Sequence, residues 1–202
     1  MFPLETWGAN YIATTTAYAT ENQYRVLSSV DSNTVTFNPG SVHGNVTLNE
    51  GEYVDLQTTE DFSVSCSEPC AVTEFTLADD YFGSSVDSDP AMGLLVPVEQ
   101  FRKDYTFLVP SSMTRNYVNI IKPVGIGAPT IFMDGVAIDE VDFGFAIGNS
   151  YYGVARVNIS SAPYAHTLES SQPFGIMVYG FASYTSYFYA GGLDLNIINV
   201  LE

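Results

Sequence analysis

The feature that most constrains the fold of this sequence is an alternation of polar and apolar residues with a period of two. It is clearest at residues 34–37, 45–48 and 62–65, which read T-V-T-F, N-V-T-L and F-S-V-S. Successive side chains of a β-strand point to opposite faces of a sheet, so this alternation is typical of strands with one buried face. Turn-forming groups such as N-P-G at 38–40 and N-E-G at 49–51 separate the runs at spacings of about ten residues. The pattern predicts an all-β fold with an antiparallel β-sandwich architecture.

Composition indicates a folded protein and excludes two classes of partner. Apolar residues make up 46% of the 202 residues and aromatic residues 14%, which is far from the composition of disordered chains. The formal net charge is −17, from 6 Lys and Arg against 23 Asp and Glu. Nucleic acids and anionic membrane surfaces attract basic proteins, so neither is an expected partner. No apolar run approaches the roughly 18–20 residues that cross a bilayer, so membrane insertion is not expected either.

The sequence also contains a weak internal repeat. Residues 3–11 and 97–105 share three identical positions at an offset of 94: Pro3/Pro97, Glu5/Glu99 and Tyr11/Tyr105. Residues 34–37 match 130–133 at an offset of 96, and residues 69–72 match 173–176 at an offset of 104. An offset that grows along the chain is what loop insertions in a second copy would produce. We therefore predict two weakly similar β-rich copies, 1–89 and 90–202, packed as one unit or as a tandem pair.

The two cysteines, Cys66 and Cys70, stand in the string C-S-E-P-C. One C-x3-C pair with no histidine nearby is a poor zinc signal, and redox-active pairs are usually spaced C-x-x-C. We favour a local disulfide across the turn at Pro69 and keep two free thiols as the alternative. A disulfide would indicate an oxidising, extracellular compartment.

Four longer stretches together resemble the IgG Fc-binding protein N-terminal domain family. The first stretch is G-A-N-Y-I-A-T-T followed by R-V-L-S-S-V-D-S-N-T-V-T-F, and the second is G-E-Y-V-D-L leading to F-S-V and P-x-A-V. The third contains D-P-A-M, P-V-E-Q-F-R-K-D-Y-T-F-L-V-P and N-Y-V-N-I-I. The fourth is V-Y-G-F-A-S-Y-T-S-Y-F-Y-A-G-G-L at 178–193. The last string is the most specific, and the resemblance covers most of the chain. Members look like extracellular modules of mucus proteins in animals and of large surface or secreted proteins in bacteria. The resemblance implies a non-enzymatic, β-rich module for binding or adhesion.

Calcium is the cofactor that the acidic clusters could hold, because it prefers carboxylate, carbonyl and amide oxygens. From Glu50 to Asp89 there are 11 acidic residues and no basic residue. The first candidates are Asp87 and Asp89, which lie at the predicted junction of the two copies. Solvated turn acids are the simpler interpretation of the same residues.

The aromatic string near the C-terminus is the candidate ligand-binding surface. Tyr184, Tyr187 and Tyr189 alternate with small or polar residues and could present an exposed aromatic face to a glycan or a peptide. The alternative is a structural corner in which the tyrosines pack on the sheet.

No constellation in the sequence predicts catalysis. The two histidines, His43 and His166, are far apart in sequence, and no G-x-S-x-G nucleophile elbow is present. Nothing singles out one carboxylate pair for glycoside hydrolysis among so many acids.

We therefore expect a non-catalytic recognition or adhesion module of a larger extracellular or surface protein. Its partners would be glycans or proteins on a host or neighbouring cell, together with the flanking domains of its own chain. The alternatives are a structural spacer with no ligand and a secreted glycan hydrolase with an unrecognised acid pair. A smooth surface with buried tyrosines would favour the spacer, and a deep cleft with two facing carboxylates would favour the hydrolase.

Overall fold

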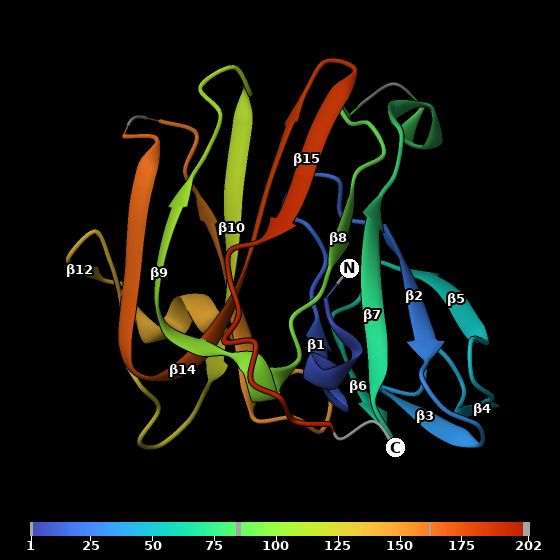
Figure 1. The fold of residues 1–202 in the computed structure, drawn as a ribbon. Coiled ribbons are helices and arrows are strands. Elements are labelled where there is room, and N and C mark those ends of the chain that lie inside the picture. The colour runs from blue at the N-terminus through green and yellow to red at the C-terminus, as the bar shows by residue number, and fades with distance from the viewer. Residues whose placement is uncertain (1, 84–85, 162, 200–202) are drawn as a thin grey trace.

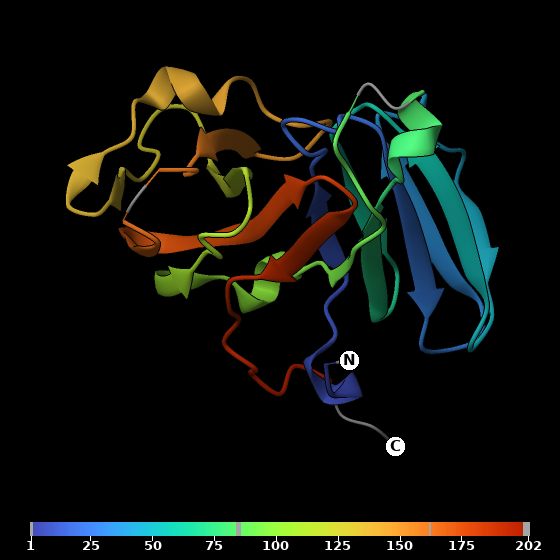
Figure 2. The ribbon, with the colours of Figure 1, turned by 90° about the horizontal axis from the view of Figure 1, so that it is seen from above.

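The structure, a computed structural model, describes residues 2–83, 86–161 and 163–199 (Figure 1). These residues form antiparallel strands and short 3₁₀ helices, with no longer helix among them, so the predicted all-β class is confirmed. Figure 2 shows two blocks of strands side by side, with the N-terminal residues at their junction. We call residues 2–94 the first half and residues 95–199 the second half, because the sheets change membership after Leu94.

The first half is a sandwich of two four-stranded sheets. One has the order β1-β6-β3-β4 and the other the order β5-β2-β7-β8. The bounds are β1 (Asn10–Ala13), β2 (Asn22–Ser28), β3 (Asn33–Asn38), β4 (Val46–Leu48), β5 (Tyr53–Thr58), β6 (Phe62–Cys66), β7 (Cys70–Thr76) and β8 (Met92–Leu94). Side chains in β2 alternate between buried and half-buried, as the period-two pattern predicts.

The second half is built around β14, which runs through both parts of a seven-stranded sheet. The path is β12-β11-β14-β10-β13, and β9 and β15 also pair with β14. The bounds are β9 (Arg102–Leu108), β10 (Arg115–Pro123), β11 (Ile131–Met133), β12 (Val136–Ala137), β13 (Tyr152–Asn158), β14 (Ala165–Ala182) and β15 (Thr185–Ala190). The β9–β14 register shifts between Glu169 and Phe174, so one long strand serves two sets of partners.

The expected boundary between 89 and 90 falls before β8, which nevertheless adds to the first-half sheet beside β7. The largest core cluster also crosses the boundary: Met177, Tyr179 and Phe181 of β14 pack with Tyr24 and Phe62 of the first half. The halves therefore share a hydrophobic core. The two-copy division itself remains a prediction.

Four 3₁₀ helices connect the strands in the described part of the chain: η1 (Leu4–Thr6), η2 (Asp79–Phe82), η3 (Val98–Gln100) and η4 (Glu140–Phe143). Of these, η1 and η3 are the repeated P-x-E segments of the sequence. Each follows a proline in an extended conformation and ends at an extended aromatic residue, Trp7 or Phe101.

One predicted strand is shorter than expected. The β-branched and aromatic residues from Tyr11 to Ala17 predict a single strand, yet β1 ends at Ala13. Beyond it the backbone N–H groups donate to side chains instead of to a neighbouring strand: Thr15 to Asp61, Thr16 to Asn22 and Ala17 to the Tyr179 hydroxyl. These contacts draw the chain out of the sheet and across the junction between the halves.

Candidate ligand-binding groove

A groove lies over the outer face of the β1-β6-β3 part of the first sheet, where that face meets the second half. Its volume is about 410 Å³, within the size range of small-ligand sites. In Figures 1 and 2, β1 lies beside the second half, which places the groove at the junction. The lining residues are Asn10, Tyr11, Ile12, Thr36, Asn38, Ser63, Val64, Ser65, Val98, Asn149, Ser150, Tyr151 and Tyr152.

The floor of the groove is set by strand register. Ser65 of β6 is paired with Asn10 of β1 on one side and Thr36 of β3 on the other, which gives one polar row across three strands. Two residues further along, Ser63 stands between Ile12 and Asn38 in a second row. Because alternate residues share one face of a strand, the two rows lie on one surface, where Asn, Ser and Thr side chains stand beside the buried Ile12.

The wall of the groove is the turn from Ile147 to Tyr152 in the second half. Ile147 N–H donates to Tyr152 O at 2.7 Å, and the Ser150 hydroxyl donates to Ile147 O at 2.6 Å. Ile147 is buried in a small cluster with Ile12 of β1 and Phe101, and the Tyr152 ring packs edge-on against Phe101. The wall is therefore fastened to the shared core and holds a fixed position over the floor.

Gly148 brings this wall against the floor. Its φ is +56°, and a Cβ added there would collide with the backbone carbonyl of Asn38 at the end of β3. Only glycine combines the left-handed backbone with this close approach. The contact sets the wall against the end of β3, where Asn38 belongs to the groove floor.

The side chains that line the groove carry no formal charge, although the protein is strongly acidic. A carboxylate lies beside it: Glu99 Oε1 accepts hydrogen bonds from Ala9 N, Asn10 N and Asn10 Nδ2 at 3.3, 3.2 and 2.9 Å. Burial, with a smaller contribution from Glu99, raises the pKa of Tyr152, so its hydroxyl stays neutral at physiological pH. The groove is thus a neutral, hydrogen-bonding surface.

Tyr151 stands at the rim of the groove and is 79% exposed. Its carbonyl accepts a hydrogen bond from Val124 N at 2.8 Å, which holds the backbone while the ring remains free in solvent. An exposed aromatic ring on a held backbone, beside hydroxyl and amide groups, is a common arrangement in binding sites.

The three tyrosines that the sequence indicates do not form one exposed face. Tyr184 is 78% exposed at the β14–β15 turn. Tyr187 and Tyr189 are half-buried and stack on each other, and their hydroxyls donate to Asn116 Oδ1 and to Leu108 O at 2.7 Å each. Burial raises the pKa of both. Of the three, only Tyr184 presents a free ring to solvent.

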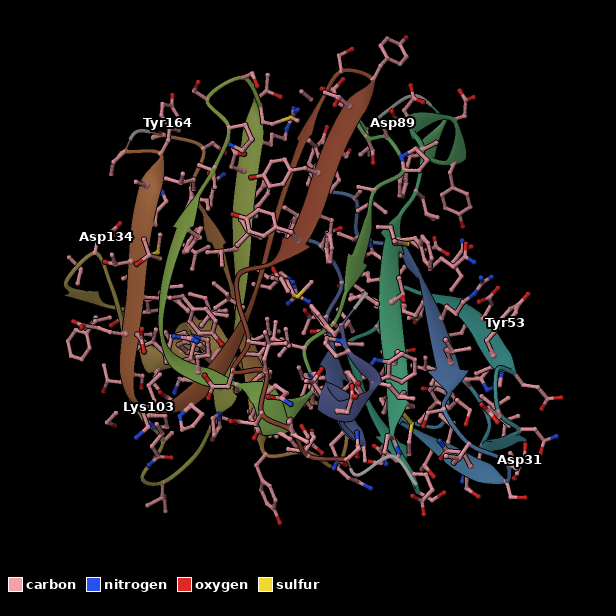
Figure 3. All side chains as sticks on the ribbon, viewed as in Figure 1. Asp31, Tyr53, Asp89, Lys103, Asp134 and Tyr164 are labelled. Atoms are coloured by element: carbon pink, nitrogen blue, oxygen red, sulfur yellow. A yellow bond between two sulfur atoms is a disulfide. The ribbon has the colours of Figure 1, made fainter. Side chains whose placement is uncertain are left out.

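Asp87 and Asp89 face different partners. The Asp87 carboxylate accepts a hydrogen bond from Arg115 at 2.9 Å, and Asp89 contributes its backbone to contacts with Ser186 and Thr76. Figure 3 shows Asp89 between η2 and β15. Within the described residues, no group of three or more His, Cys, Asp or Glu side chains is placed to hold a metal ion. Calcium dependence therefore stays a prediction.

Cys66 and Cys70 are joined by a disulfide in the structure, with Cα atoms 6.4 Å apart. The bond links the end of β6 to the start of β7, which belong to opposite sheets of the first-half sandwich. It lies in the core cluster and does not line the groove.

The pair formed by His166 and Asp134 is not arranged as a hydrolase triad. His166 Nδ1 contacts Asp134 Oδ2 at 2.7 Å, and Asp134 also accepts from Thr167 N. The other ring nitrogen, His166 Nε2, is buried and has no hydrogen-bond partner among the described residues, so no nucleophile faces it there. Asp134 stands at the β11–β12 turn (Figure 3), and neither it nor His166 lines the groove.

Sequence reasoning missed the groove because its floor and wall are about 140 residues apart in the chain, as Asn10 and Tyr151 show. One signal was present. In a chain with 23 acids, the outward positions 10, 36, 38, 63 and 65 are all Asn, Ser or Thr.

Three comparisons place the chain among known proteins. The family model described as IgGFc binding protein matches residues 1–180. The human IgGFc-binding protein is 20% identical over all 202 residues, and the chain spans only 4% of that protein's length. No solved structure matches. No helix among the described residues is long and apolar enough to cross a membrane. Because the family model covers most of the chain, this protein belongs to the IgGFc-binding protein family.

Proposed function

We propose that this chain is a non-catalytic recognition module of a larger extracellular or surface protein, and that it holds its ligand in the groove between the two halves. The observation that carries the proposal is the preformed, uncharged groove with Tyr151 at its rim. Family membership supports it, because the family description and the human relative are both named for binding. If the ligand is displayed on a host or neighbouring cell, binding in the groove would produce adhesion to that cell.

The groove is already formed without a ligand, so few side chains or loop residues have to become ordered when a ligand binds. The wall is held by Ile147 in the shared core, by the Ser150 hydroxyl and by the contact of Gly148 with Asn38. Sites whose side chains and loops are already fixed lose less conformational entropy on binding. The disulfide between Cys66 and Cys70 supports an extracellular location, because such bonds persist in oxidising compartments.

The test is an array of extracellular glycans and proteins probed with the wild type and with Ser65→Arg, which places a long charged side chain on the groove floor. Ser65 is exposed, so the variant should fold. The matched control is Thr47→Arg, an exposed position on the same sheet that does not line the groove. We expect binding that Ser65→Arg removes and Thr47→Arg leaves intact. Binding that survives Ser65→Arg would show that the groove is not the binding site. An array with no binding, from protein that is folded, would favour the structural spacer.

The same array run in a chelator tests the proposed calcium dependence. Spots that vanish would support an ion bound by the module, and Asp87→Asn and Asp89→Asn would then show whether these residues hold it. Because Asp87 is paired with Arg115, its substitution also removes that contact. Arg115→Gln is therefore the control that breaks the ion pair without removing a carboxylate.

A further inference from the structure

We propose that the groove selects neutral carbohydrate: an uncharged, hydroxyl-rich saccharide that lies on the Asn/Ser/Thr floor with one sugar ring against Tyr151. This rests on the proposed function of the groove and goes further by naming the class of ligand.

Charge is the first reason. The lining contains no carboxylate, ammonium, guanidinium or imidazole group. An anionic ligand would lose hydration on entering and find no opposite charge to replace it, and the Glu99 carboxylate lies beside the groove. The net charge of −17 also repels anions before contact. Sialylated or sulfated glycans are therefore poor ligands, and a neutral saccharide meets neither penalty.

Hydrogen bonding is the second reason. Sugar hydroxyls donate and accept, so they need partners that do both, as hydroxyl and carboxamide groups do. The Thr36 hydroxyl and the Asn38 carboxamide have no hydrogen-bond partner among the described residues, and neither side chain is fully buried. The Ser65 hydroxyl donates to Asn10 Oδ1 at 3.0 Å, which leaves its own lone pairs to accept. The floor thus offers donors and acceptors side by side.

The Tyr151 ring is the third reason. One face of many sugar rings carries C–H groups, which pack on an aromatic face and bury apolar area. Tyr151 is 79% exposed at the edge of the polar floor, and its backbone is held by Val124. The hydroxyls at the edge of a stacked ring could then reach the floor.

A protein ligand fits the groove less well. Peptides that bind as added strands use free backbone groups at a sheet edge. The groove lies over the face of the sheet, and the backbone of β6, the central strand of its floor, is paired with β1 on one side and β3 on the other. Protein interfaces are usually anchored by apolar or aromatic side chains in pockets, whereas Tyr11, Ile12 and Val64 of this floor are buried and the less buried floor side chains are Asn, Ser and Thr.

The experiment is calorimetric titration of the full chain with N-acetyllactosamine, mannotriose and cellotriose as neutral probes, and with sialyllactose and a heparin hexasaccharide as anionic ones. The variants are Tyr151→Ala and Thr36→Val. The control is Tyr184→Ala, because Tyr184 is equally exposed but lies at the β14–β15 turn. Circular dichroism and the melting temperature confirm folding in every variant.

We expect at least one neutral probe to bind and both anionic probes to fail. Tyr151→Ala should weaken binding about tenfold or more and Thr36→Val about fivefold, as expected for the loss of one ring contact and one hydrogen bond. Tyr184→Ala should leave binding unchanged.

Three results would overturn the inference. Equal or tighter binding of the anionic probes would remove the neutral selectivity. Binding of proteins but no saccharide, still sensitive to Ser65→Arg, would reject carbohydrate while leaving the groove as the binding site. Saccharide binding that is lost in Tyr184→Ala and retained in Tyr151→Ala would show that the saccharide binds elsewhere. It would therefore reject both the groove as the binding site and carbohydrate as its ligand.

Discussion

The two halves of the molecule begin with the same local structure and then build different sheets. In each, a proline leads into a 3₁₀ turn, an extended aromatic residue and a buried tyrosine. The Tyr11 hydroxyl donates to the carbonyl of Cys70 at 2.6 Å, and the Tyr105 hydroxyl donates to the carbonyl of Phe174 at 2.5 Å. Cys70 and Phe174 each follow a proline, and the sequence repeat pairs them with each other.

The surroundings of the two tyrosines differ. In the first half Cys70 is bonded to Cys66, and the strands form two four-stranded sheets. In the second half Phe174 packs edge-on against the Tyr105 ring, and one long strand supports a seven-stranded sheet. Burial raises the pKa of Tyr105 to about 12, so its hydroxyl keeps its proton as a donor at physiological pH. The comparison teaches that a short anchoring contact can recur while the sheets around it diverge.

The largest effect expected is from removing one core ring in either half. Phe62→Ala in the first half and Phe174→Ala in the second should each cost about 3–5 kcal/mol, because both side chains are fully buried. Since the main core cluster contains residues of both halves, each variant should lower a single transition in thermal or urea unfolding. Two separated transitions would show that the halves unfold independently.

A second contrast concerns buried ionisable groups. Lys122 of the second half is fully buried and paired with Glu140. Glu74 of the first half is also fully buried, but neither of its carboxyl oxygens has a hydrogen-bond partner among the described residues. Burial, with a smaller contribution from Asp61, raises the pKa of Glu74 well above its usual value. The folded state therefore retains a proton that the unfolded state releases.

From this we predict that stability falls as pH rises between the unfolded and folded pKa values of Glu74. The contribution is fully present below the unfolded pKa and is lost as pH rises through the folded pKa, with a slope of about 1.4 kcal/mol per pH unit between them. Glu74→Gln should remove this slope and unfold at higher urea concentration than the wild type at neutral pH. Parallel urea midpoints for the two proteins from pH 4 to 8 would contradict the prediction. Glu68→Gln, at an exposed carboxylate of the same half, is the comparison variant.

Reducing the disulfide should destabilise the first half by about 2 kcal/mol. The cysteines are four residues apart, and closing so short a loop removes little entropy from the unfolded chain. The measurement is the urea midpoint with and without reductant, and a Cys66→Ala, Cys70→Ala double variant should be insensitive to reductant. A loss as large as that of Phe174→Ala would mean that the bond does more than restrict the unfolded chain.

The smallest effect tests the shared anchor directly. Tyr11→Phe should cost about 1 kcal/mol, because it removes one buried hydrogen bond to the Cys70 carbonyl. Tyr105→Phe should cost more, because the Tyr105 hydroxyl donates to the Phe174 carbonyl and also accepts from Arg102 N. The double variant should show the sum, since the two contacts share no partner. Equal losses would show that the hydrogen bond from Arg102 N adds nothing to the anchor in the second half.

The sequence predicted the strands where burial is one-sided. Alternation at 34–37 and 62–65 corresponds to β3 and β6, and the turn at 38–40 closes β3. The β-branched and aromatic residues at 174–181 also predict a strand, but the observed strand β14 is longer and starts at Ala165. The polar residues 169–173 interrupt the pattern because they lie at the register shift where partners change.

The candidate site was less predictable than the fold for a different reason. A strand pattern is local, whereas the groove depends on how the turn at 147–152 approaches a sheet formed early in the chain. Tyr187 and Tyr189 show the converse. Their spacing is visible in the sequence, but their hydrogen-bond partners are not. The Tyr187 hydroxyl donates to the side chain of Asn116, and the Tyr189 hydroxyl donates to the carbonyl of Leu108.

The contact of Gly148 with Asn38 has a consequence for how this site can vary between relatives. A single added methyl group at position 148 would push the turn away from β3 and widen the groove at that end, with no change to any floor residue. A substitution at position 148 can therefore alter which shapes fit, while substitutions on the floor alter which hydrogen-bonding groups meet the ligand. The two properties are encoded in separate stretches of the chain, so each can change without undoing the other.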